Sequence, residues 1–276
     1  MTSPGWASAQ RVGWIALDAM RSLLRQRLVL GLLGAGLVGA LAGRALRELD
    51  FGGAPQRFVL DLGFASLGLL GLLVATVGTA QLVVADRESG SAALILAKPV
   101  RPIEYLAGQW LGVVSLVSLF AVAGGTAVGV LVHTTPVTVD AWGEWPQPRL
   151  TRLPSGVACA TIALLFKLAL VGAGARLVAS LTRGSTTAIV VTVVAVIAAH
   201  LRGGAETYYG GNGIIAQTAA LALRVLPNLG EFELAGLVAA GDAVTFAHCA
   251  TLGAHTAAYA GLYLLAAAQL EQQRGL

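Results

Sequence analysis

Charged side chains are scarce in this sequence. Lysine and arginine contribute 18 residues and aspartate and glutamate 14, so only 12% of the 276 residues are charged, about half the roughly 25% of soluble domains. Hydrophobic residues make up 56% of the chain, and the mean hydropathy is +0.76. So few charges cannot solvate a globular surface, so the composition excludes an ordinary soluble domain and predicts an all-α integral membrane protein.

Cysteine is rare, and clustered positive charge is missing. Cys159 and Cys249 both lie in apolar runs, which excludes a disulfide framework. The net charge is +4, but the basic residues are scattered along the chain rather than gathered in one patch. A nucleic-acid partner is therefore not expected.

Motifs of catalysis and nucleotide binding are also absent. The chain has no P-loop, no GxSxG and no HExxH. Gly34, Gly36 and Gly39 spell GxGxxG, but they lie in an apolar run with no preceding strand, so they do not form a dinucleotide site. We predict no catalytic residue, no metal site and no resident cofactor in this chain.

Two histidines are the nearest approach to a metal or proton-relay site. His248 and His255 are seven residues apart and share one helix face, with Cys249 beside the first. Two imidazoles without a carboxylate between them make a poor metal site. Buried polar residues that hydrogen-bond a neighbouring helix are the favoured interpretation.

Six apolar runs are long enough to cross a bilayer, which needs about 20 residues per helix. They lie at 28–44, 62–85, 111–132, 156–176, 186–201 and 245–268. Small residues recur at every fourth position in Ala35, Gly39 and Gly43, in Gly108 and Gly112, and in Gly125 and Gly129. This spacing predicts close helix contacts at those positions.

The arginines before the first run predict the orientation. Arg11, Arg21, Arg25 and Arg27 precede residue 28, and positive residues before the first span favour a cytoplasmic amino terminus. An even number of spans returns the carboxyl terminus to the same side. We therefore expect both termini in the cytoplasm.

Three segments outside the runs give further predictions. Residues 6–27 place Trp6 and Trp14 among arginines, which predicts an amphipathic helix lying in the cytoplasmic interface. Residues 86–110 combine charges with a small apolar stripe, and Pro99 and Pro102 interrupt the helix, so they predict a short amphipathic helix, a stop and a second helix. Residues 202–244 predict an extracytoplasmic loop, with an interfacial or re-entrant helix over 214–226.

Lys167 lies within the fourth run. An ammonium group in the bilayer costs at least about 2.5 kcal/mol, so it is a candidate for a translocation pathway or for pairing with a carboxylate. The alternative is that its long side chain extends toward the cytoplasmic surface.

The segment 86–110 resembles the signature of the ABC type-2 permeases. In that family the loop after the second span carries an acidic residue, Gly-Thr or Gly-Ser, a Leu-rich turn, Pro-Val, a basic residue and Gly-Lys. The matching residues here are Glu88, Gly90-Ser91, Leu94, Leu96, Pro99-Val100, Arg101 and Gly108. Gln109 replaces the family's lysine.

A second stretch is similar to the permeases of the multicopper-enzyme-maturation branch. It comprises Leu226-Pro227-Asn228-Leu229, Phe232, Tyr259 and Tyr263. The two resemblances imply one transmembrane permease domain over residues 1–276, with six spans and an ABC type-2 exporter-like fold. They also imply a bacterial cytoplasmic (inner) membrane location.

The same resemblance implies partners. In such families a coupling helix after the second span docks on a separate ABC ATPase subunit, which binds ATP and Mg. Here Asp86, Glu88, Gly90, Leu94, Pro99 and Arg101 would form or orient that contact. A second permease copy, the lipid bilayer and a periplasmic or accessory protein are the other expected partners.

Two other functions fit the same features. A membrane scaffold or mechanotransmission subunit would bind an ATPase without moving a solute, and the sequence does not separate it from a transporter. An ion-coupled secondary carrier would need no ATPase. An inverted repeat would favour the carrier, and none is visible.

Overall fold

The computed structural model describes residues 4–46, 55–90, 101–135, 153–208, 226–240, 242 and 244–273. These residues form helices and contain no strand. The elements in chain order are α1 (Pro4–Leu24), α2 (Arg27–Leu46), α3 (Pro55–Glu88), α5 (Pro102–Thr134), α6 (Leu153–Leu181), α7 (Ser185–Tyr208), the 3-10 helix η2 (Leu229–Phe232), α9 (Leu234–Ala239) and α10 (Phe246–Gln273).

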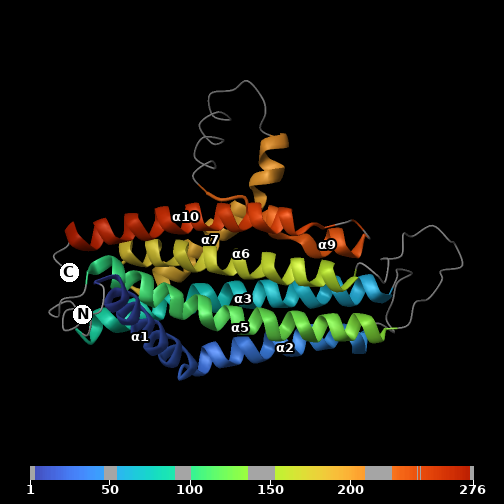
Figure 1. Ribbon diagram of the computed structural model, residues 1–276, viewed down its shortest axis with the longest axis horizontal. Coiled ribbons are helices and arrows are strands. Elements are labelled where there is room, and N and C mark those ends of the chain that lie inside the picture. The colour runs from blue at the N-terminus through green and yellow to red at the C-terminus, as the bar shows by residue number, and fades with distance from the viewer. Residues whose placement is uncertain are drawn as a thin grey trace, which may run out of the picture.

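The long helices lie side by side in an elongated bundle (Figure 1). Helices α3, α5 and α6 contact one another at its centre, α2 packs on α3, α10 packs on α6, and α1 packs on α5. Helix α6 is mostly buried, whereas few residues of α2 and α7 are buried. Both termini lie at one end of the bundle, here called the terminal end. The bundle core therefore consists of the most apolar helices, and exposed apolar side chains cover its outside.

Five helices are long and apolar enough to cross a membrane: α2, α3, α5, α6 over 154–181, and α7 over 185–202. They contain the first five predicted spans, so the described residues are all-α, with five helices long and apolar enough to cross a membrane. The sixth predicted span, 245–268, is helical in α10, but α10 is not among the five. Polar residues such as His248 and His255 lower its hydropathy, so a sixth span stays a prediction.

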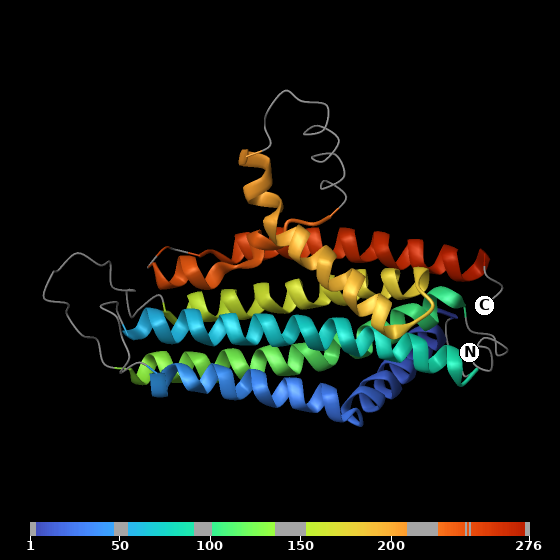
Figure 2. The same cartoon turned by 180° about the vertical axis from the view of Figure 1, so that it is seen from behind.

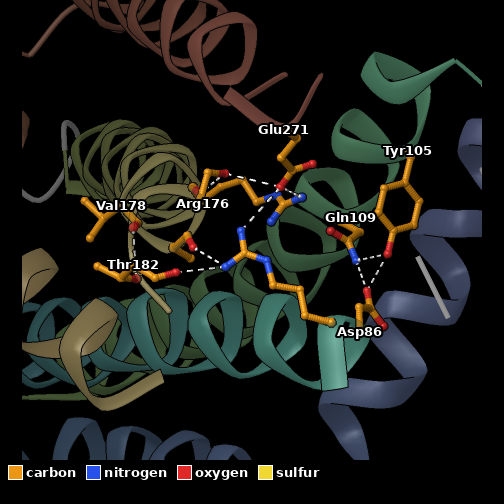
Figure 3. A network of polar contacts seen from close by, with 10 residues as sticks. Asp86, Tyr105, Gln109, Arg176, Val178, Thr182 and Glu271 are labelled. Atoms are coloured by element: carbon orange, nitrogen blue, oxygen red, sulfur yellow. Dashed lines mark hydrogen bonds and ion pairs between the residues drawn. The ribbon is translucent and has the colours of Figure 1, made fainter. Parts of the chain in front are cut away.

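Helix α3 is much longer than a bilayer core. It has 34 residues, which corresponds to about 51 Å at 1.5 Å per residue, against a hydrocarbon thickness of about 30 Å. Helix α5 has 33 residues. Both helices must therefore extend beyond the hydrocarbon. Of the charged residues labelled in Figure 3, Asp86 lies in the last turn of α3, whereas Arg176 and Glu271 belong to α6 and α10.

The structure corrects the predicted loop 202–244. Helix α7 continues to Tyr208, and its last part turns away from the bundle (Figure 2). After residue 226 the chain packs on the bundle through η2 and α9, with Leu229, Phe232 and Leu234 buried. The helix expected over 214–226 lies outside the described residues, apart from residue 226 itself. The sequence did not indicate η2 and α9 because these short buried turns are too brief to give a periodic pattern.

Glycines allow two of the closest helix contacts. A Cβ atom added at Gly112 would lie 2.6 Å from the backbone oxygen of Ala16, and one at Gly108 would lie 2.7 Å from Ile15. Both neighbours belong to α1, so these glycines let α1 approach the backbone of α5. The other small-residue repeats also face neighbouring helices, Gly39 and Gly43 toward α3 and Gly125 and Gly129 toward α6. The spacing therefore predicted close helix contacts correctly at these glycines but not at Ala35, which is exposed.

The predicted amphipathic helix 6–27 corresponds to α1. It ends at Leu24, and the chain changes direction before α2 begins at Arg27 (Figure 2). Ala19 and Leu23 are buried against the bundle, while Trp14 is exposed on the other face. The helix is thus confirmed, and its position in the membrane interface stays a prediction.

Candidate functional site

The candidate coupling residues flank a short gap in the described chain. Asp86 and Glu88 lie in the last turn of α3, and Gly90 follows with a φ of 67°. Only glycine adopts this left-handed conformation at little cost, so Gly90 stops α3. Arg101 is the N-cap of α5. Leu94 and Pro99, and with them the short amphipathic helix expected there, lie outside the described residues.

Asp86 joins the end of α3 to the beginning of α5. Its Oδ2 atom accepts a hydrogen bond of 2.5 Å from the hydroxyl of Tyr105 and another from the Nε2 atom of Gln109. Gln109 also donates to Tyr105 at 2.9 Å. Gln109, which stands where the family signature has lysine, therefore serves as a buried donor to Asp86. Figure 3 shows the three side chains together.

Arg87 joins the same turn to α6. Its Nη1 atom donates to the backbone oxygens of Ala179 and Thr182, each at 2.9 Å. These carbonyls lie in the last turn of α6 and just beyond it, where helical carbonyl groups lack internal partners. Arg87 Nη2 also lies 3.9 Å from Glu271 Oε1 in α10. Arg87 thus caps the end of α6 and contacts α10.

A buried ion pair completes this network. Arg176 Nη2 lies 2.8 Å from Glu271 Oε1, and the two side chains are 3% and 9% exposed. Ser180 donates to the same carboxylate oxygen at 3.3 Å. The Nε and Nη1 atoms of Arg176 have no hydrogen-bond partner within the described residues. Two arginines therefore share one carboxylate in a site from which water is largely excluded (Figure 3).

Glu104 connects α5 to α1. Ser8 donates to Glu104 Oε1 at 2.5 Å, and Arg11 contacts both carboxylate oxygens at 3.2 Å. The backbone N–H of Arg101 donates to Glu104 Oε2 at 3.3 Å. The carboxylate therefore caps α5 and holds α1 at the same time. Glu88, by contrast, is exposed.

The flanks of residues 91–100 are thus fixed to four other parts of the bundle. Asp86 and Arg87 before the gap contact α5, α6 and α10, and Glu104 after the gap contacts α1. Asp86 and Arg87 therefore contact other helices rather than water alone. The sequence did not identify Tyr105, Arg176 or Glu271, although the spacing of four between Tyr105 and Gln109 places them on one helix face.

Lys167 belongs to a second polar site, in the middle of α6. Its Nζ atom lies 2.9 Å from Glu233 Oε1, and the lysine side chain is 6% exposed against 60% for the glutamate. His200 Nε2 lies 3.4 Å from the same oxygen. Lys167 therefore pairs with a carboxylate, one of the two expected roles.

The charge environment of Glu233 favours its ionised form. Partial burial raises the pKa of this carboxyl, but the hydrogen bond and positive charge of Lys167, with a smaller contribution from His200, lower it by more. The net pKa lies below the usual 4.5. Glu233 is thus a carboxylate that neutralises a buried ammonium group.

The two histidines of α10 do not form the expected buried contacts. His248 and His255 are both exposed, and the Nδ1 atom of His255 lies 3.9 Å from Glu231 Oε2. No group of three or more His, Cys, Asp or Glu residues suited to a metal occurs in the described part of the chain. Their interpretation as buried polar residues was wrong because it assumed that both lie on the inner face of α10.

Known proteins give no further guide to the site. No protein-family model matches this chain, and no curated sequence matches it significantly.

Proposed function

We propose that this chain is the transmembrane permease subunit of an ABC transporter and that it exports or translocates a substrate. A separate ATPase subunit would bind ATP and Mg and would dock on the segment around residues 91–100. Two permease copies would pair, in a bacterial inner membrane, with both termini in the cytoplasm. The resemblance of 86–110 to the family signature and the five membrane-crossing helices support the proposal.

The network at the terminal end carries the proposal. A coupling segment works only if a force on it reaches the helices that line the pathway. Asp86 and Arg87 join α3 to α5, α6 and α10, and Glu104 joins α5 to α1. The described chain on either side of residues 91–100 is therefore held by contacts to other helices. A partner that moved this segment would move the connected helix ends as a rigid body.

The experiment is purification of the tagged chain from native membranes in mild detergent, with mass spectrometry of its partners. The test variant carries Glu88→Lys and Leu94→Asp. The control variant carries the same two kinds of change, Asp18→Lys and Leu17→Asp, at exposed positions of α1 near the same end. We expect an ATPase with a P-loop to accompany the wild type and the control and to be lost from the test variant.

Other outcomes separate the parts of the proposal. If no ATPase accompanies the wild type under conditions that preserve membrane complexes, the proposal that the chain is a permease subunit is overturned. An ATPase that accompanies both variants equally would show that it docks elsewhere. An ATPase without any transported solute in reconstituted vesicles would indicate a scaffold or mechanotransmission subunit instead.

An ion-coupled carrier is the second candidate function, because Lys167 and Glu233 form an ion pair against the middle of a membrane-crossing helix. Ionisable residues at such depth are typical of ion and proton pathways. A carrier would transport its solute in vesicles that contain this chain alone. Its transport would depend on an ion gradient and not on ATP.

A further inference from the structure

A cavity beside Lys167 lies outside the terminal-end network. It has a volume of about 560 Å³ and lies between α3, α6, α7 and the η2–α9 segment. Most of its wall is apolar, with Phe64, Leu72, Leu164, Val196 and Phe232 among the lining residues. Cavities of roughly 300–1,000 Å³ with such walls and a few polar groups hold small molecules.

Part of the rim of the cavity is apolar, although the exposed Asp61 and Glu233 also line it. Leu69 of α3 and Ile197 and Leu201 of α7 line it, and each of these side chains is more than half exposed. All three belong to helices that are apolar enough to cross a membrane. In a bilayer the opening would therefore face lipid chains, so a molecule with an apolar body can enter it from the side.

Basic side chains in the charged wall of the cavity already bind one carboxylate, that of Glu233. Lys167 Nζ and His200 Nε2 converge on one oxygen of Glu233, at 2.9 and 3.4 Å. The lysine is fixed in the buried face of α6, whereas Glu233 is 60% exposed and lies in a non-helical residue between η2 and α9. The carboxylate of Glu233 can therefore leave more easily than the ammonium group. A ligand that replaced it would have to be an anion, because the buried ammonium group needs a counter-charge.

We propose that this cavity binds a single-chain amphipathic carboxylic acid, whose carboxylate displaces Glu233 from Lys167 while its hydrocarbon chain lies along the apolar wall. Glu233 then acts as an internal competitor that keeps the site neutral when it is empty. This inference does not rest on the proposed ATPase partner, because the isolated chain forms the whole site. Its failure would leave the coupling experiment unaffected.

The test uses the full chain purified into phosphatidylcholine nanodiscs, with empty nanodiscs as the background. The probe is 11-(dansylamino)undecanoic acid, compared with its methyl ester and with a dansyl-labelled undecylamine of the same length. We expect saturable binding of the acid, at least roughly tenfold tighter than the ester, as a charge-assisted hydrogen bond predicts. Equal affinity for acid and ester, or preference for the amine, would overturn the proposal.

Two charge variants identify the groups involved. Lys167→Met should bring the affinities of acid and ester within about twofold of each other, since the counter-charge is gone. Glu233→Gln should raise the affinity for the acid, because the competing charge is removed. Glu231→Gln is the matched control: Glu231 lies two residues before Glu233, is not among the residues that line the cavity, and its Oε2 atom lies 3.9 Å from His255, so its loss should leave the affinity unchanged. A gain in Glu231→Gln as large as that in Glu233→Gln would contradict the proposed competition.

A third variant locates the bound probe without changing charge. A Cβ atom at Gly68 would contact only Leu164, at 3.9 Å, and a larger side chain there would project into the cavity. Gly68→Leu should therefore weaken both acid and ester. Unchanged binding would place the probe elsewhere and overturn the proposed binding site. Folding of each variant is judged by helical circular dichroism and gel filtration. The Gly68→Leu result does not depend on whether Lys167→Met folds.

Discussion

Replacement of Glu271 by glutamine tests whether the buried network holds the terminal end together. The Glu271 carboxylate accepts from Arg176 at 2.8 Å and from Ser180 at 3.3 Å, and it lies 3.9 Å from Arg87. Glutamine has nearly the same shape, but it removes the negative charge. The substitution would leave a fully buried guanidinium group with no neutralising partner in α10.

The size of the effect follows from the burial of the pair. The side chains of Arg176 and Glu271 are 3% and 9% exposed, and removal of one partner of such a pair typically costs about 3–5 kcal/mol. Arg87 is affected less, because two backbone oxygens at 2.9 Å remain as its acceptors. Removal of both charges in Arg176→Met with Glu271→Leu should cost at most about 1–2 kcal/mol, since apolar side chains of similar volume often replace a buried pair without loss.

The assay is reversible unfolding by SDS titration in mixed micelles, which gives a free energy of unfolding for each variant. Asp61→Asn is the control, because its partner Arg57 is exposed and such pairs contribute less than about 1 kcal/mol. A loss below about 1 kcal/mol for Glu271→Gln would refute the reasoning. A double variant as unstable as the sum of the single changes would refute it too, since the two charges would then not interact.

Three further substitutions test other contacts. Gly112→Leu should detach α1 from α5 and speed hydrogen exchange in α1, because the Cβ atom at residue 112 would lie 2.6 Å from the backbone oxygen of Ala16. Gly34→Leu is the control. A Cβ atom at residue 34 would have nothing within 4 Å, so α1 should stay protected. Gly90→Ala should destabilise the chain by about 1–2 kcal/mol in the same titration, because φ is 67° there. Glu233 has a lowered pKa, so its bond to Lys167 stabilises the fold above pH 4.5 and is lost as the pH falls through the lowered pKa. Glu233→Gln should remove this acid-dependent loss from the unfolding free energy, and an unchanged pH profile would contradict the role of the pair.

The helices could be predicted from the sequence because their signals are local. Apolar runs bounded by charges located the first five spans, and Pro102 marks the first residue of α5, where its missing N–H does no harm. Contacts between helices could be predicted only in part. The small-residue repeats showed that Gly108 and Gly112 face another helix, but nothing local identifies that helix as α1.

In the candidate site, too, local signals could be predicted from the sequence, whereas contacts between distant residues could not. The resemblance to a permease signature singled out Asp86 and Glu88, yet only Asp86 contacts other helices. Arg176 and Glu271 gave no local signal of their ion pair. They are distant from each other in the sequence and meet only in the folded bundle. Lys167 stood out by its cost in a membrane, whereas Glu233 lay in a segment read as a loop.

The contact between α1 and α5 has a consequence for how the chain is made. Ser8 and Glu104, which bind each other, are 96 residues apart. A ribosome that adds about 5–20 residues per second needs roughly 5–20 s to synthesise the stretch between them. During that time the surface of α1 around Ala19, which Gly112 of α5 later contacts, lacks its α5 partner. An amphipathic helix in this state would wait on the membrane surface, so α1 is made before α5 and packs on it only once α5 has been synthesised.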